Sequence, residues 1–174
     1  VDEGSEAPEV VFESAAEITL RAVHDGRPAL IRRLREACPS AVERARLIHG
    51  ARICAGLDLP GVLRVLQAPA AGNGFSLITE DFGGVPLRAL LDRQELEIPA
   101  ALRLTRDLSK ILGEIHQRGV VHRDVQPARI YVHPRSGEVK LGGFELGSRL
   151  RAEIAPPLGA WGGEGRLAYL SPEQ

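Results

Sequence analysis

The sequence predicts an α+β fold with two lobes: a small lobe built on an antiparallel sheet with one helix, and a second lobe that is mainly helical. Short runs rich in β-branched and aromatic residues fill the first half of the 174-residue chain. Gly83-Gly84 then separates these runs from a long amphipathic helical pattern. A cleft between two such lobes is a natural place for a ligand.

The first half divides into an acidic lead-in over residues 1–9, which we expect to be disordered, and a small lobe over residues 10–82. Residues 10–34 read as strands joined by a turn at Asp25-Gly26. A helix is expected to follow Pro39-Ser40, with Gly50 in its middle at a cost of about 1 kcal/mol against Ala. Its apolar positions are Val42, Ala45, Leu47, Ile48, Ala51 and Ile53. Residues 61–69 and 75–82 read as two further strands.

The second lobe, residues 83–174, begins with helical patterns over residues 86–94 and 100–119. Gly119 is the expected stop of the longer helix. Residues 128–144 then read as a strand–turn–strand hairpin, and residues 155–165 as a loop. The apolar stripe of the longer helix consists of Leu104, Leu108, Ile111, Leu112 and Ile115.

Composition narrows the classes of function. The net charge is −1, so no basic field points to nucleic acid as a partner. No apolar run reaches about 18 residues, so we expect no membrane span and a cytoplasmic location, where Cys38 and Cys54 would be reduced thiols. The chain starts with Val and contains no Met, so we expect a fragment or an unusual start codon.

Five segments in order carry a resemblance to a known family. They are "LDLPGVLRV", "EDFGG", "GEIHQRGVVHRDVQPARIYV", "SGEVKLGGFELGSRL" and "LAYLSPEQ". From about residue 10 to residue 174 the chain resembles a protein kinase domain, and most of all the Ser/Thr-kinase-like module at the front of large bacterial signalling proteins with ATPase and GAF modules. The resemblance implies the two-lobed kinase fold, truncated after the "SPE" motif, with ATP and Mg²⁺ as possible cofactors.

The resemblance assigns a catalytic role to His122-Arg123-Asp124, with Asp124 accepting the proton of the substrate hydroxyl and the other two bracing the loop. Asp124 could equally persist as a brace, and His122 reads better as a packed structural residue. The expected metal ligands are replaced by Arg129 and Gly143, neither of which can bind Mg²⁺. Glu145 stands two residues after the missing ligand and is expected to point elsewhere, although a rearranged loop could bring it in.

The expected nucleotide contacts are also altered. The phosphate-gripping Lys is replaced by Arg32, its helical Glu partner aligns with Gly50, and the glycine-rich loop reads "FESAAEITL". Glu43 lies seven residues before Gly50, about 10 Å along the helix axis, which is too far to substitute for that partner. The resemblance places the remaining nucleotide contacts at Leu30, Glu80, Phe82 and Tyr131, of which Leu30 and Tyr131 could equally be ordinary core residues.

Two functions remain open. One is a pseudokinase that acts as a regulatory or interaction module, with other domains of the same signalling protein or a separate protein as its partner. The alternative is an unconventional but active ATP-dependent Ser/Thr kinase, with Arg32 on the phosphates and Glu145 or another acidic residue on the metal. Whether the chain is an enzyme therefore depends on how these side chains are arranged.

Overall fold

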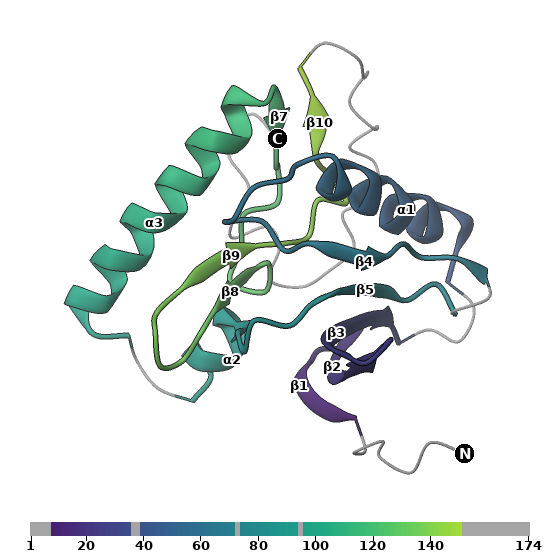
Figure 1. The fold of residues 1–174 in the computed structure, drawn as a ribbon, viewed down its shortest axis with the longest axis horizontal. Coiled ribbons are helices and arrows are strands. Elements are labelled where there is room, and N and C mark those ends of the chain that lie inside the picture. Colours follow the sequence, from purple (N-terminus) through teal and green to yellow (C-terminus); the bar gives the residue numbers. More distant parts are fainter. Residues whose placement is uncertain (1–7, 36–38, 72–73, 94–95, 151–174) are drawn as a thin grey trace.

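The computed structural model describes residues 8–35, 39–71, 74–93 and 96–150, arranged as a sheet-rich part and a mainly helical part (Figure 1). The predictions for residues 1–7, for Cys38, for the loop over residues 155–165 and for the "SPE" motif concern residues outside these ranges. The elements are β1 (Glu9–Glu13), β2 (Glu17–His24), β3 (Arg27–Leu34), α1 (Ala41–Ala55), β4 (Val65–Gln67), β5 (Leu77–Glu80), β6 (Val85–Pro86), α2 (Leu87–Leu91), α3 (Ile98–Gln117), β7 (Val120–Val121), β8 (Ile130–Val132), β9 (Val139–Leu141) and β10 (Ser148–Arg149).

The small lobe is a five-stranded antiparallel sheet in the order β1-β2-β3-β5-β4. The predicted turn is confirmed: Asp25 and Gly26 both have positive φ, 49° and 72°, as a tight two-residue hairpin requires. The turn sets His24 opposite Arg27, and the same register carries the pairing through both strands. β1 begins at Glu9, within the segment expected to be disordered.

Helix α1 starts where the sequence predicts. The Ser40 side chain accepts a hydrogen bond from the Glu43 amide, and the Glu43 carboxylate accepts one in return from the Ser40 amide, which is a complete capping box. Only the second half of the helix is well buried, so Val42 and Ala45, expected on its apolar face, are exposed. The buried residues are Leu47, Gly50, Ala51, Ile53 and Cys54.

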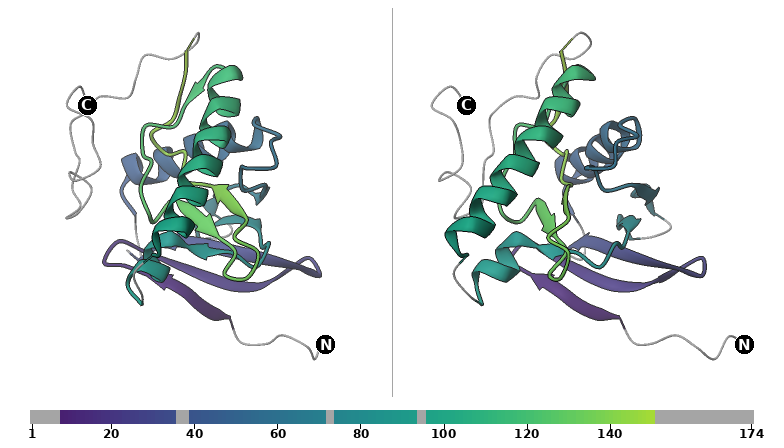
Figure 2. Two further views of the ribbon diagram at one scale, coloured as in Figure 1. Left: turned by 90° about the vertical axis from the view of Figure 1, so that its left-hand side faces the viewer. Right: turned by 60° about the vertical axis from the view of Figure 1, so that its left-hand side comes forward.

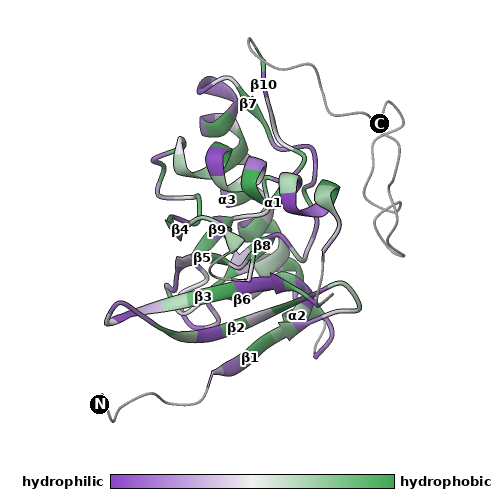
Figure 3. Cartoon of the chain, turned by 90° about the vertical axis from the view of Figure 1, so that its right-hand side faces the viewer, coloured by the Kyte–Doolittle hydropathy of each residue, from purple (hydrophilic) through white to green (hydrophobic). Residues whose placement is uncertain are grey.

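The second lobe is organised around α3, which packs against β7 and β9 (Figure 2). Its end is as predicted, since Gly119 follows with a φ of 71° that suits glycine. Hydrophobic and hydrophilic residues alternate along α3 (Figure 3), and Ile111 and Ile115 are its buried residues. The predicted hairpin is β8–β9, which β6 extends to three strands. Helix α2 covers only five of the expected nine residues.

One hydrophobic cluster joins the two lobes. It contains α1 residues together with residues of α3 and of the segment from β8 to Phe144, so the position of α1 is tied to the loop after β9. The buried members of the cluster are Ile53, Cys54, Leu57, Val62, Leu87, Ile111, Ile115, Val120, Ile130, Val139, Leu141 and Phe144.

Within the described residues, no helix is both long and apolar enough to cross a lipid bilayer.

Candidate functional site

A small cavity lies between the lobes, where β3, α1, β8 and the loop after β9 meet. It leaves about 20 Å³ for the centres of water molecules, whereas one water needs roughly 10–15 Å³. This volume has room for about one water molecule. Its lining is Leu30, Arg32, Gly50, Cys54, Leu63, Leu77, Thr79, Tyr131 and Gly142 to Glu145.

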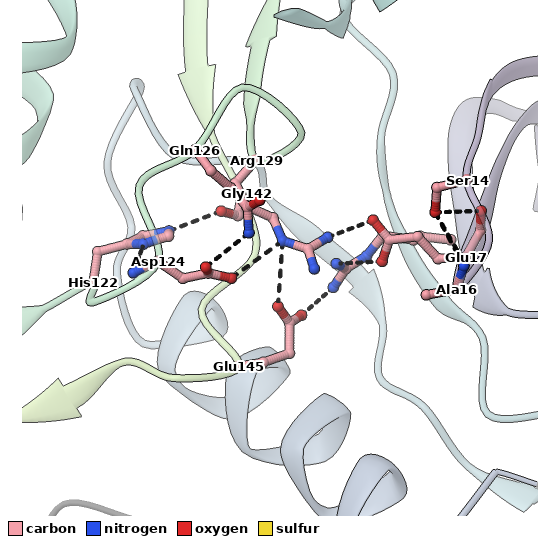
Figure 4. A network of polar contacts seen from close by, with 10 residues as sticks. Ser14, Ala16, Glu17, His122, Asp124, Gln126, Arg129, Gly142 and Glu145 are labelled. Carbon is pink, nitrogen blue, oxygen red and sulfur yellow. Dashed lines mark hydrogen bonds and ion pairs between the residues drawn. The ribbon is translucent and has the colours of Figure 1, made fainter. Parts of the chain in front are cut away.

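A buried network of charges joins the lobes beside this cavity (Figure 4). Two guanidinium groups, from Arg32 of β3 and Arg129 of the loop before β8, meet three carboxylates. Nη1 of Arg129 lies 2.6 Å from Oε1 of Glu17, and its Nε lies 3.5 Å from Oδ2 of Asp124. Arg32 contacts Glu145 through Nη2 and donates from Nη1 to Oε2 of Glu17 at 3.4 Å. Every member is less than 9% exposed.

Glu17 stands at the start of β2, in the segment where the family resemblance places the glycine-rich loop. The Ser14 hydroxyl accepts hydrogen bonds from the amides of Ala16 and Glu17, and this local turn orders the entry into the strand. Burial would raise the pKa of Glu17, but the charges of Arg129 and Arg32 outweigh it and lower that pKa. An ionised carboxylate therefore bridges both guanidinium groups, Arg32 through Oε2 and Arg129 through Oε1.

The expectation that Glu145 points away is wrong. Its side chain lies in the network and pairs with Arg32, so it takes the role that the resemblance assigned to the position of Gly50. Burial would raise the pKa of Glu145, but Arg32 and Arg129 together lower it to about 2. Helix α1 can approach this loop because Gly50 has no side chain: a Cβ there would lie 2.8 Å from the Glu145 amide nitrogen.

Arg129 and Gly143 fit each other sterically. Gly143 has a φ of 78°, and a Cβ on it would overlap Cδ of Arg129 and lie 2.9 Å from Cγ. The arginine stem therefore fills the space beside Gly143, and its guanidinium brings a positive charge to a position that should hold an oxygen ligand. These residues do not fit Mg²⁺. Within the described ranges, no three His, Cys, Asp or Glu side chains are grouped to hold a metal ion.

The three residues of the catalytic motif are held as a structural unit. His122 is buried, with Nε2 donating to the Gly142 carbonyl at 2.8 Å and Nδ1 accepting from the Asp124 amide at 3.2 Å. Its ring packs on Phe144 with a centroid distance of 4.5 Å, and burial lowers its pKa. Arg123 has a φ of 62°. The Asp124 carboxylate accepts from Gln126 at 2.7 Å and faces Arg129.

The residues expected around adenine make contacts within the chain. Leu30 and Tyr131 are 1% and 5% exposed and belong to a cluster with Val11 and Leu63. The side chain of Glu80 pairs with Lys140 at 2.7 Å. Phe82 packs against that cluster, and the Lys140 ammonium lies 5.1 Å from its ring centroid. All four side chains are committed to the protein itself.

Sequence reasoning missed Glu17, although a signal was present. A two-residue turn at Asp25-Gly26 sets Thr19 opposite Arg32, as the structure has it. Glu17 lies two positions from Thr19 and so on the same face of the strand. The turn alone thus predicts a carboxylate diagonal to Arg32. Its pairing with Arg129 depends on how the lobes meet and has no local signal.

Comparison with known proteins gives a consistent result. A family model described as protein tyrosine and serine/threonine kinase matches residues 11–174. The serine/threonine-protein kinase PkaB of Streptomyces coelicolor is 35% identical over 119 residues, which cover 67% of this chain and 28% of PkaB. The serine/threonine-protein kinase PknA of Mycobacterium tuberculosis is 32% identical over 142 residues, covering 78% of this chain and 32% of PknA.

The serine/threonine-protein kinase pkn2 of Myxococcus xanthus is 28% identical over 132 residues, 74% of this chain and 16% of pkn2. The chain thus spans less than a third of the length of these relatives. The matched segment contains the sheet with its one helix, the long helix α3 and the His122-Arg123-Asp124 loop. The chain belongs to the protein tyrosine and serine/threonine kinase family.

Proposed function

We propose that this kinase-like domain is a pseudokinase, a regulatory or interaction module that does not transfer phosphate. The observation that carries the proposal is the position of Arg129, whose side chain reaches Glu17 and Asp124 where a kinase would hold its metal and the phosphates of ATP. Phosphoryl transfer depends on positioning and on neutralising the charge of the transferred group. Both requirements need space that the protein's own charges now fill.

The state of Asp124 supports the same proposal. A catalytic base must reach the hydroxyl group of a substrate. Here both carboxylate oxygens have partners within the chain, Oδ1 with Gln126 and Oδ2 with Arg129, and the residue is 5% exposed. We infer that Asp124 braces the loop rather than acting on a substrate.

The partner of such a module would be another domain of the same bacterial signalling protein or a separate cytoplasmic protein. The partner would recognise the shape of this module rather than a reaction that the module carries out. We expect the interaction to be independent of ATP, because the closed arrangement of the site needs no nucleotide.

Mg-ATP distinguishes the proposal from an unconventional active kinase. We expect the melting temperature of the chain to be the same with and without saturating Mg-ATP. We also expect no transfer of labelled phosphate to the chain itself or to a generic acceptor protein, with wild type and Asp124→Asn giving the same background. An Mg-dependent rise with transfer that Asp124→Asn abolishes would contradict the proposal and favour an active kinase that uses Arg32 and Glu145.

A further inference from the structure

We propose that the guanidinium of Arg129 is a tethered replacement for a divalent cation, and that the carboxylates around it become a divalent-cation site when it is removed. The inference deepens the proposed function and rests on it. In this proposal the positive charge at the centre of the site comes from the Arg129 side chain. The lobes are therefore joined without metal or nucleotide.

The contacts of Arg129 are those of a central cation. Its guanidinium faces three carboxylates from three separate parts of the chain: Glu17 at 2.6 Å, Asp124 at 3.5 Å and Glu145 at 4.0 Å. Glu17 comes from β2, Asp124 from the loop after β7, and Glu145 from the loop after β9. Arg129 thus contacts all three of these mutually repelling segments, whereas Arg32 contacts Glu17 and Glu145.

The charge balance of the network favours a doubly charged ion in place of the guanidinium. Three carboxylates and two guanidinium groups leave a net charge of −1. If a neutral residue replaced Arg129, Arg32 would be the one positive group facing the carboxylates of Glu17, Asp124 and Glu145. The net charge of the network would then be −2. A divalent cation would neutralise that charge, and oxygen ligands are what Mg²⁺, Mn²⁺ and Ca²⁺ prefer.

One carboxylate oxygen at the site has no hydrogen bond. Oε2 of Glu145 is fully buried, its residue is 7% exposed, and it lies 4.0 Å from Nε of Arg129. A buried carboxylate oxygen without a donor is costly. The guanidinium therefore leaves part of the coordinating capacity of the carboxylates unused. A cation could take it up once the guanidinium is removed and the carboxylates move together, because no three acidic side chains among the described residues are now close enough to share a metal ion.

The steric fit between Arg129 and Gly143 makes the two kinds of cation mutually exclusive. An aspartate at position 143, where the family resemblance places the metal ligand, would overlap the stem of Arg129. With asparagine at position 129 that space is open. Aspartate also tolerates the positive φ of position 143 better than most residues do. Two substitutions should thus restore a ligand pair without disturbing the rest of the loop.

The test measures the melting temperature of the whole chain in EDTA and in Mg²⁺ or Mn²⁺ alone, without nucleotide. The variants are Arg129→Asn, Arg129→Lys, Gly143→Asp and the double variant Arg129→Asn/Gly143→Asp. We expect wild type and Arg129→Lys to be indifferent to the cation. Arg129→Asn and the double variant should melt lower in EDTA and gain about 5–10 °C at a hundredfold excess over Kd, the double variant at lower cation concentration.

Gly143→Asp alone should be destabilised and gain nothing from the cation. The proposal is overturned if cations stabilise wild type, if folded Arg129→Asn and the double variant both ignore them, or if both stay unfolded even with Mn²⁺. If the variants fold only with Mn²⁺, its binding counted by electron paramagnetic resonance gives the supporting result of one ion per chain. Failure of the proposed function would look different, as phosphate transfer by wild type in Mg-ATP.

Discussion

At the scale of single residues, His122 is held as a neutral imidazole. Its Nδ1 accepts from the Asp124 amide, so the ring proton lies on Nε2, which donates to the Gly142 carbonyl. A second proton on Nδ1 would break the first of these hydrogen bonds. The ring is also buried against Phe144, and this burial lowers its pKa.

The lowered pKa of His122 predicts a loss of stability in mild acid. Below the ordinary histidine pKa of about 6.5 the unfolded chain binds a proton that the folded chain does not, so the free energy of unfolding falls as the pH falls. The slope from this one group is at most about 1.4 kcal/mol per pH unit. Urea unfolding from pH 7.5 to 5 measures it. A His122→Gln variant should be less stable but have a shallower slope; an unchanged slope would contradict this reading.

Glu145 predicts a second, more acidic window. Its pKa is lowered from 4.5 in the unfolded chain to about 2 in the folded one, because Arg32 and Arg129 outweigh the effect of burial. The stability it contributes is present above pH 4.5 and lost as the pH falls towards 2. We expect Glu145→Gln to unfold more readily at pH 7 and to lose less stability between pH 4.5 and pH 3 than wild type. Equal losses in the two proteins would refute the assignment.

At the scale of elements, the close approach of α1 to the loop after β9 controls the geometry of the site. A Cβ atom at position 50 would lie 2.8 Å from the Glu145 amide nitrogen and 2.9 Å from the Phe144 carbonyl carbon. Both neighbours are backbone atoms, which cannot turn aside as a flexible side chain can. The glycine that weakens the helix by local propensity therefore allows Glu145 to reach Arg32.

Two matched substitutions separate packing from helix propensity. Gly50→Ala should destabilise the protein by about 1–3 kcal/mol through overpacking, although alanine is the better helix former. Gly113→Ala, in α3, meets no atom within 4 Å and should stabilise by up to about 1 kcal/mol. Chemical denaturation of both variants measures the difference. Two changes of the same sign would show that α1 does not depend on this contact.

The elements were largely predictable because their signals are local. Ser40 with Glu43 defines the start of α1, Asp25-Gly26 defines the β2–β3 turn, and Gly119 defines the end of α3. The candidate site was predictable only in part of its membership, since Glu17 was missed. Arg129 and Gly143 were identified as replaced ligands, but the direction of Glu145 depends on a loop conformation that no pattern of residues specifies.

At the scale of the whole molecule, the ion network ties the small lobe to the second lobe. Glu17 belongs to β2 and Arg129 to the loop before β8, and both side chains of the pair are buried. Since burial removes water that would otherwise screen the charges, breaking one partner leaves the other uncompensated. The arrangement of the lobes is therefore part of the stability of the fold.

Glu17→Ala tests this link against an exposed pair. We expect the free energy of unfolding to fall by about 3 kcal/mol, as for other broken buried ion pairs. Glu9→Ala is the control, since Glu9 is 65% exposed in its side chain and pairs with Arg21 at 3.1 Å; it should cost about 0.5 kcal/mol or less. Guanidinium or urea denaturation measures both. A Glu17→Ala variant as stable as the control would mean that the lobes are held by apolar packing alone.

The partners in this network are far apart along the chain, 112 residues between Glu17 and Arg129 and 113 between Arg32 and Glu145. A ribosome adding about 5–20 residues per second would release the first member of each pair roughly 5–20 s before the second. In the nascent β2–β3 hairpin, the side chains of Glu17 and Arg32 must therefore stay in water or pair with each other. This lasts until the segment with Arg129 and Glu145 has been synthesised. Synthesis itself leaves an interval in which the earlier sheet stands open to other binders.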